Sequence, residues 1–376
     1  METRQLTHIT ACVNRNVISG KDLSGLLSEC GIVQFNLISG RNAFLRERTG
    51  LLGSFLPGPA MISSLSDVIS FLVDPKDEFT ALHAISDKFQ ITIAGNGSVF
   101  SDAFSVIGGE DLYAANKPAA PSGDRPVFQS DIIGICCIVQ RGEGDTLARA
   151  VLDSSIGSPV ISYGTGTGLR DKVGLLRITI PAEKEILLVT TDSYSADQAF
   201  DMLVYTGRLD QPGKGFIYLW DIGDGLINPK VSESVPLHAA NMEQIIFAVD
   251  EMKGSTQWRR KNIAQAGGAG NRKTLSGLEG LDVICNEGRA DDLTAAAMAA
   301  GAAGATISKF RYVFPGEIGE GRPSPAREMC SMIIGEKQAG SIILALENAG
   351  LFDRNTLGQI RIKKVPKACT YLGKPG

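Results

Sequence analysis

Apolar and polar positions follow two different rhythms through the middle of the chain. The run IIGICCIVQ, residues 132–140, is apolar and rich in β-branched residues, which predicts a buried strand. The next apolar residues, Leu147, Val151 and Leu152, share one face at helical spacing and predict a helix from about Gly144 to Ser154. The short run PVISY after it predicts a second strand.

The same order of elements then follows once more. A loop leads to GLLRITIPAEKEILLVTTD, which has the pattern of a strand system. SADQAFDMLVYTG predicts a helix with Ser195 and Asp197 at its start, and GFIYLWDI predicts a last strand. The segment is therefore β-α-β-loop-β-α-β. Two such βαβ halves in tandem form the ferredoxin-like arrangement.

Similar sequences recur along the chain at a nearly constant offset. Ile161 in GSPVISYG and Ile307 in AGATISKF differ by 146 positions (307 − 161), as do RGEGDTL and EGRADDL. Thr206 of TGRLD and Ala349 of AGLFD have an offset of 143 (349 − 206). The N-terminal part repeats more faintly, with an offset of 124 from Cys12 to Cys136 (136 − 12) and of 123 from Ile38 to Ile161 (161 − 38). Matching segments in a constant order indicate an internal repeat.

We therefore predict three related units, at residues 1–108, 129–223 and 276–376, joined by linkers at 109–128 and 224–275. A ferredoxin-like sheet carries helices on one face and leaves its other apolar face uncovered. Burial of apolar surface stabilises by about 25 cal/mol per Å², so three copies in one chain gain by covering one another. The predicted fold class is α+β, with three ferredoxin-like domains in an intrachain pseudo-trimer.

The longer linker contains a second helical pattern. Met242, Ile245, Ile246, Val249 and Met252 recur at helical spacing and predict a helix at about 238–261. Two interpretations stay open, a helix that lies along the surface of the domains and a helix that binds a partner.

Composition excludes several broad classes of protein. The chain has 376 residues, 43% apolar content and a net charge of -4, which disfavours a general nucleic-acid binder. The start METRQLTHIT has no signal-peptide pattern, and no run of about 18 apolar residues predicts a transmembrane helix. We therefore expect a cytoplasmic protein without a transmembrane segment.

The cysteines and histidines predict neither a disulfide framework nor a metal site. The seven cysteines are odd in number, form no CxxC pair and stand mostly in apolar runs, which favours buried, reduced thiols. The three histidines are far apart in sequence, so a histidine-based metal or catalytic cluster is not expected.

The stretch YTGRLDQPGKGFIYLWDI places a lysine in a glycine-rich turn, which raises the question of a phosphate-binding P-loop. Five residues separate Gly207 from the Gly213-Lys214 pair, where a P-loop has four. Gly215 follows the lysine and offers no hydroxyl for magnesium. The order is also reversed, because this turn leaves a helix and enters a strand. Any anion site here is of another type.

The middle unit resembles the PII signalling proteins of nitrogen regulation and their PII-like relatives. Four pieces carry the resemblance in order: IVQRGEGDTL, the second strand with the glycine-rich turn VISYGTGTG, PAEKEILLV, and TGRLDQPGKGFIYLWDI. The family implies a trimer with sites for adenine nucleotides between subunits, so ATP, ADP or AMP is the expected effector. It also implies a target protein, contacted by the T-loop that follows the second strand.

The resemblance assigns nucleotide-binding residues to two segments. The B-loop comprises Gly207, Arg208, Gly213, Lys214 and Gly215, and the base of the T-loop comprises Gly164, Thr165, Gly166 and Thr167. Glycines allow backbone N–H groups to converge on an anion, and charge-assisted bonds to phosphate are strong. The plain alternative is that Gly207 caps a helix and Pro212-Gly213 only turns the chain.

The other two units depart from this pattern. The C-terminal unit has RNTLGQIRI in place of the lysine turn, and the N-terminal unit has DKFQITIAGNGSVF without a clear lysine. We therefore expect unequal clefts, of which one keeps most of the motif. The neighbouring wall has candidate cations that are equally well explained as solvated surface charges: Arg41, Arg46, Arg311, Arg361 and Lys363. Long loops in these units could contact a partner protein.

Three functions follow, in descending order of support. The first is a regulatory sensor that binds a nucleotide or similar anion and signals to a partner. The second is a scaffold or small-molecule-binding protein whose nucleotide sites have decayed. An enzyme is the weakest, since Glu183 and Glu185 at i and i+2 of a strand are typical solvated edge charges. Cys136 and Cys137 lie in an apolar strand and are expected to be inert.

Overall fold

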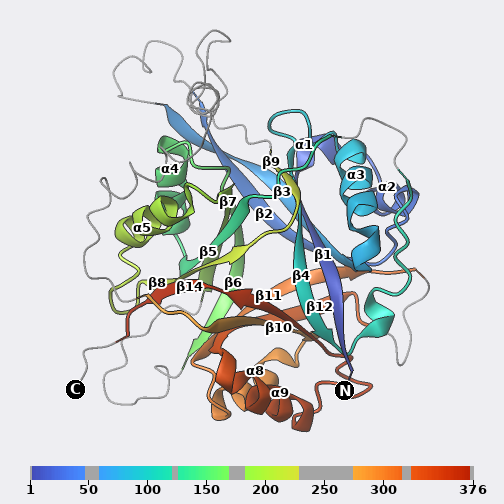
Figure 1. Cartoon of the computed structure of the whole chain (residues 1–376), viewed down its shortest axis with the longest axis vertical. Helices are drawn as coiled ribbons and strands as arrows, with labels where there is room; N and C mark the ends of the chain where they lie inside the picture. The colour runs from blue at the N-terminus through green and yellow to red at the C-terminus, as the bar shows by residue number, and fades with distance from the viewer. Residues whose placement is uncertain are drawn as a thin grey trace.

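The computed structural model describes residues 2–46, 59–120, 126–168, 183–227, 274–315 and 323–372. Within these residues the protein is a mixed α+β fold, as the sequence predicts. In the described ranges, fourteen strands form one antiparallel sheet, and seven α-helices pack around it (Figure 1).

Three successive segments of the chain repeat the element order β-α-β-β-α-β, with one additional short helix in the first. The first segment contains β1 (Thr3–Asn14), α1 (Arg15–Ile18), α2 (Leu23–Glu29), β2 (Phe35–Arg46), β3 (Ala60–Val73), α3 (Glu78–Lys88) and β4 (Gly97–Ile107). The second contains β5 (Ile132–Gln140), α4 (Gly144–Asp153), β6 (Val160–Gly168), β7 (Glu183–Asp192), α5 (Ala196–Gly207) and β8 (Gly215–Asp221). The third contains β10 (Leu278–Asn286), α8 (Ala290–Ala299), β11 (Gly304–Val313), β12 (Ala326–Gly335), α9 (Ala339–Asn348) and β13 (Gln359–Val365).

The strands of each segment are neighbours in the sheet and keep the same order. That order is β4-β1-β3-β2 in the first, β8-β5-β7-β6 in the second and β13-β10-β12-β11 in the third. The helices of the three segments lie in three separate groups on the outside, around a centre made of strands (Figure 1). Two short strands are added to this pattern. β9 (Gly225–Ile227) pairs with β4, and β14 (Lys367–Thr370) pairs with β8.

Backbone pairing between segments closes the sheet. The middle of β2 pairs with the start of β6, through Arg41 and Ile161. The end of β6 pairs with the start of β11, and the end of β11 pairs with the start of β2, through Arg311 and Leu37. β13 also pairs with β4. The three segments are therefore joined by hydrogen-bonded ladders as well as by side-chain packing.

Each segment has its own apolar core between its strands and its helices. In the second segment, the predicted helix face is buried: Leu147, Val151 and Leu152 are at most 1% exposed. They pack with Phe200 and Leu203 of α5, which are fully buried. Full burial of a side chain of this size stabilises by about 1.5–3 kcal/mol, so these spacings alone explain why both helices dock.

Several predicted elements are confirmed, and one lies where the structure gives no description. The helices predicted at 144–154 and 195–207 and the strand GFIYLWDI correspond to α4, α5 and β8. The helix predicted at 238–261 lies outside the described residues. The predicted domain and linker boundaries stay predictions.

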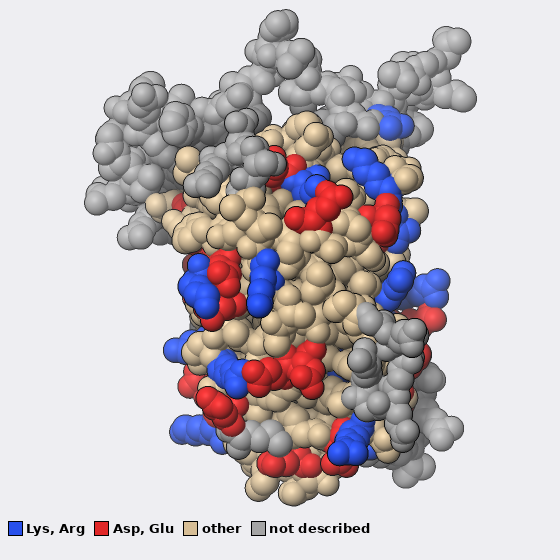
Figure 2. Space-filling model, turned by 90° about the vertical axis from the view of Figure 1, so that its right-hand side faces the viewer, with Lys and Arg blue, Asp and Glu red and all other residues tan. Residues whose placement is uncertain are grey.

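All seven cysteines are buried, as expected, and none of them forms a disulfide. Burial raises the pKa of the Cys136 thiol to about 11 and that of Cys137 further still, so both are protonated at neutral pH. Among the described residues, no helix has the length and apolar character needed to span a membrane. On the face shown in Figure 2, basic and acidic side chains are interspersed, in keeping with the small net charge.

The backbone of Gly215 gives a test of this packing. Its φ of +141° disfavours any L side chain, and an added Cβ would lie 2.4 Å from the carbonyl oxygen of Ile138. We expect Gly215→Ala to lower the free energy of unfolding by at least about 2 kcal/mol in urea titrations. Gly340 in α9 has open space at its Cβ, so Gly340→Ala should be neutral or stabilising by up to about 1 kcal/mol. Equal effects of the two changes would contradict the structure.

Candidate functional site

The predicted B-loop joins α5 to β8 in two turns. α5 ends at Gly207, and Arg208 takes the left-handed conformation with a φ of +52°. The N–H of Leu209 then donates to the Val204 carbonyl at 3.0 Å, and the Leu209 side chain is fully buried. This is the Schellman arrangement that ends many helices. The capping position is therefore Arg208 and not Gly207, and Arg208 carries an exposed guanidinium.

Lys214 follows at the tip of the next turn. Gly213 before it has a φ of +73°, and the Gly213 carbonyl accepts a hydrogen bond from Gln140 Nε2 at 2.8 Å. The Lys214 ammonium lies 2.9 Å from Glu143 Oε1, with both side chains about one-third exposed. The other oxygen, Glu143 Oε2, is buried without a hydrogen-bond partner among the described residues. The lysine is thus held by one partly solvated carboxylate.

The predicted base of the T-loop is a strand and not a turn, which corrects the sequence interpretation. β6 continues through Gly164, Thr165, Gly166 and Thr167 to Gly168. Thr165 is paired with Glu183 of β7 on one side and with Ile307 of β11 on the other. The turn prediction failed because the glycines serve close strand packing: a Cβ on Gly164 would lie 3.0 Å from the Ile307 carbonyl oxygen.

The predicted B-loop and the predicted base of the T-loop lie at the same end of the sheet of the second segment, on its opposite edges. Gly215 on β8 is opposite Val139, Val139 is opposite Glu185, and Glu185 is opposite Tyr163. Three strand spacings of about 4.8 Å place Gly215 roughly 14 Å from Tyr163. The open hollow of about 1050 Å³ beside Gly164 is not lined by any residue of 207–215.

Glu185 lies between the predicted B-loop and the predicted base of the T-loop. Its position shows that the interpretation as a solvated edge charge was wrong. It is 4% exposed on the interior strand β7. Its Oε2 accepts hydrogen bonds from the N–H groups of Gly142 at 3.0 Å and Gly144 at 2.7 Å, at the start of α4. Its Oε1 accepts from Arg41 of β2 at 3.3 Å. Glu183, in contrast, is exposed and pairs with Arg141.

The third segment has the same arrangement, which we call a carboxylate cap: a strand carboxylate that accepts hydrogen bonds from the N–H groups at the start of a helix. Glu328 stands at the same register position on β12 and is 6% exposed. Its Oε2 accepts from the N–H groups of Gly288 at 2.9 Å and Ala290 at 3.1 Å, at the start of α8. In the first segment the position is Asp67, which binds Arg15 through both carboxylate oxygens. A strand carboxylate that satisfies the unpaired N–H groups of a helix start is therefore structural.

The candidate wall cations are distributed over different places. Arg41 forms hydrogen bonds with Tyr163, Asp145 and Glu185, so it binds the cap described above. Arg46 ends β2 and is exposed, and Arg311 lines the open hollow beside Gly164. Arg361 and Lys363 face a cavity at the centre of the molecule. Arg361 is 6% exposed, which excludes its interpretation as a solvated surface charge.

A glycine turn of the first segment was missed from the sequence. Gly97 is opposite Val13 as Gly215 is opposite Val139, and the two glycines have similar φ values of +149° and +141°. Gly95-Asn96-Gly97 therefore corresponds to Gly213-Lys214-Gly215, with asparagine in place of lysine. It lines a cavity of about 240 Å³ between the first and second segments. The Gly-x-Gly spacing in AGNGS was the available signal.

A comparison of the sequence with models of known protein families and with curated proteins found no match. Inference about function therefore depends on the geometry and on the motifs.

Two substitutions distinguish the buried carboxylate of Glu185, which caps α4, from the exposed carboxylate of Glu183. Glu185→Gln keeps the shape but weakens two hydrogen bonds from backbone N–H groups and one from Arg41, so we expect a loss of about 2 kcal/mol in the free energy of unfolding. Glu183→Gln removes an exposed ion pair and should change it by less than about 0.5 kcal/mol. Urea titrations monitored by circular dichroism measure both. A Glu183 effect as large as the Glu185 effect would refute the assignment.

Proposed function

We propose that the protein is a PII-like regulatory sensor built as an intrachain pseudo-trimer of three ferredoxin-like repeats. Two features support the repeat: the shared β-α-β-β-α-β order and the shared strand order within each segment. The cyclic pairing of β2, β6 and β11 supports the threefold arrangement, because the second half of each strand pairs with the start of the next.

The proposed effector is an adenine nucleotide or a similar anionic metabolite, bound at the B-loop. The observation that carries this proposal is the turn at Gly213, Lys214 and Gly215, which presents an ammonium group between two glycines of positive φ. Such a turn leaves room for a phosphate to approach the backbone. Arg208 adds a second, exposed cation earlier in the same loop. The segment 164–167 at the same end of the sheet supplies the opposite wall in this proposal.

Binding at Lys214 requires little rearrangement. A partly exposed ion pair such as Lys214–Glu143 contributes about 0–1 kcal/mol. A phosphate group offers the lysine a stronger, charge-assisted partner and can displace Glu143 at small cost. Release of Glu143, which stands just before α4, then provides a local change that a partner protein can sense. This proposal gives the chain no catalytic role.

The second candidate is a scaffold whose nucleotide sites have decayed. It is favoured by the replacement of the lysine at equivalent turns, where the first segment has Asn96 and the third has Leu357 before Gly358. Neither residue supplies a charge for phosphate.

Thermal melting with ATP, ADP and AMP distinguishes the two candidates. A nucleotide at 100 times its dissociation constant should stabilise the chain by about 2.7 kcal/mol. Lys214→Ala should weaken its binding about 10- to 100-fold, whereas Lys337→Ala, at an exposed lysine of the third segment, should not change it. Glu143→Gln should strengthen binding, because the lysine no longer has to leave a carboxylate. Melting unaffected by any nucleotide would favour the scaffold, and a shift that survives Lys214→Ala would place the site elsewhere.

A further inference from the structure

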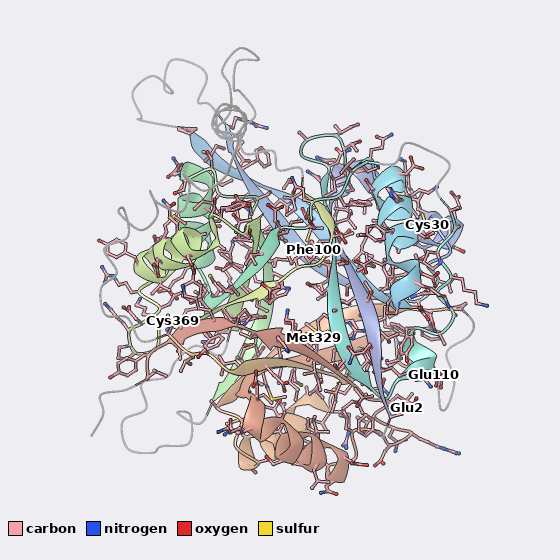
Figure 3. The ribbon with its side chains drawn as sticks, in the orientation of Figure 1. Glu2, Cys30, Phe100, Glu110, Met329 and Cys369 are labelled. Atoms are coloured by element: carbon pink, nitrogen blue, oxygen red, sulfur yellow. The ribbon has the colours of Figure 1, made fainter. Side chains whose placement is uncertain are left out.

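A cavity of about 170 Å³ lies where the inner faces of the three segments meet. Phe100 and Met329, which line it, lie on opposite sides of the centre in Figure 3. Much of the wall is apolar and aromatic. It nevertheless contains two cationic and two acidic side chains: Arg361, Lys363, Asp102 and Asp282. Charged groups in such a place are costly unless something satisfies them.

Arg361 reaches the cavity with most of its hydrogen-bonding capacity unused. It is 6% exposed, and its Nε donates to Gln359 Oε1 at 2.8 Å. No other hydrogen bond of its guanidinium is found among the described residues, so its two terminal NH₂ groups have no acceptor there, and Arg361 is one of the residues that line the cavity. Burial lowers the pKa of Arg361 to about 10, so it still carries its charge at neutral pH. A paired set of N–H donors of this kind fits a carboxylate.

Lys363 stands two positions further along β13, on the same face. Its ammonium lies 3.7 Å from the ring centroid of Trp220, 5.6 Å from that of Tyr218 and 5.7 Å from that of Phe104. These cation–π contacts hold the ammonium in place, but they leave its hydrogen bonds unmade. Within the described part of the chain, Lys363 has no carboxylate partner.

The carboxylates are positioned by neutral donors and not by the cations. Asp102 accepts from Trp220 Nε1 at 2.8 Å, and Asp282 accepts from Ser331 Oγ at 2.6 Å. His8 Nδ1 lies 3.9 Å from Asp102 Oδ2, and burial lowers the pKa of this histidine, which keeps it neutral. In the described ranges, no ion pair joins either carboxylate to Arg361 or Lys363. The two positive and two negative charges that line the cavity therefore sum to zero, but no ion pair joins them within the described residues.

We propose that the central cavity binds a small zwitterion, an α-amino acid of about six to eight non-hydrogen atoms. Asp282 and Arg361 are directly opposite each other on β10 and β13, so their Cβ atoms are about 5 Å apart. A ligand that satisfies both must carry its ammonium and carboxylate on neighbouring atoms, as an α-amino acid does. A cavity of roughly 150 Å³ holds a six-carbon ring, so the central cavity has room for a ligand of about six to eight non-hydrogen atoms. The carboxylate binds Arg361 and Lys363, the ammonium binds Asp282, and the aromatic wall covers the side chain.

The central cavity adjoins an open hollow. Ile38 and Phe310 line both the central cavity and the open hollow beside Gly164. The two spaces therefore adjoin at these residues. The hollow has Arg15, Lys309 and Arg311 on its walls. The hollow, on the side where β2, β6 and β11 meet, is therefore the entrance that we expect a ligand to use.

Calorimetric titration of the full chain tests the proposal with matched probes. L-Alanine, L-serine and L-valine are compared with 3-methylbutanoate, which is valine without its ammonium, and 2-methylpropylamine, which is valine without its carboxylate. We expect at least one amino acid to bind. If L-valine binds, each truncated analogue should bind at least about tenfold more weakly. Failure of all three amino acids to bind, or equal binding of valine and 3-methylbutanoate, would overturn the proposal.

Two variants locate the site and separate its charges. Arg361→Gln should weaken amino-acid binding about 10- to 100-fold, while Arg354→Gln, at an exposed arginine of the same segment, should leave it unchanged. Because Arg361 is buried, its substitution can also affect folding, so a second variant, Asp282→Asn, is needed. The amide oxygen of this asparagine can still accept the hydrogen bond from Ser331. It should weaken amino-acid binding and at the same time strengthen binding of 3-methylbutanoate. Amino-acid binding unaltered in a folded Asp282→Asn protein would refute the assignment.

Discussion

The cyclic pairing of three strands is the constraint on which the rest of this structure depends. β2, β6 and β11 each pair at their start with one of the other two strands and in their second half with the remaining one. Each ladder satisfies backbone N–H and C=O groups that would otherwise be exposed edges. A strand cannot leave this triangle without breaking pairs with two segments at once. The arrangement fixes how far each segment's inner face stands from the others.

The position of the polar chemistry follows from that closure. Apolar residues fill the space between strands and helices on the outside of each segment, and the helix starts are capped by strand carboxylates such as Glu185 and Glu328. A cavity remains where the inner faces of the three segments meet. That space contains Arg361, Lys363, Asp102 and Asp282. The proposed nucleotide turn lies away from it, at the junction of α5 and β8.

The sequence predicts what local spacing determines. α4, α5 and β8 were placed well, since their apolar residues alone define a face or a buried run. Residues 164–168 were predicted to turn but form a strand, because β11, which belongs to the third segment, pairs with them in addition to β7. Glu185 has the local pattern of an edge charge, and only the neighbouring start of α4 reveals its role. The match between Asn96 and Lys214 depends on strand register, which no single stretch of sequence contains.

Hydrogen exchange followed residue by residue tests the closed sheet most directly. The amides to follow lie in the β11 ladders with β6 and β2, at residues 304–307 and 311–313. The structure predicts that the hydrogen-bonded amides there are protected to about the same degree as those of the interior strand β5, because both belong to one cooperative sheet. Rapid exchange in the β11 ladders while β5 stays protected would show that the segments are not closed into a single structure, and the central cavity would lose its walls.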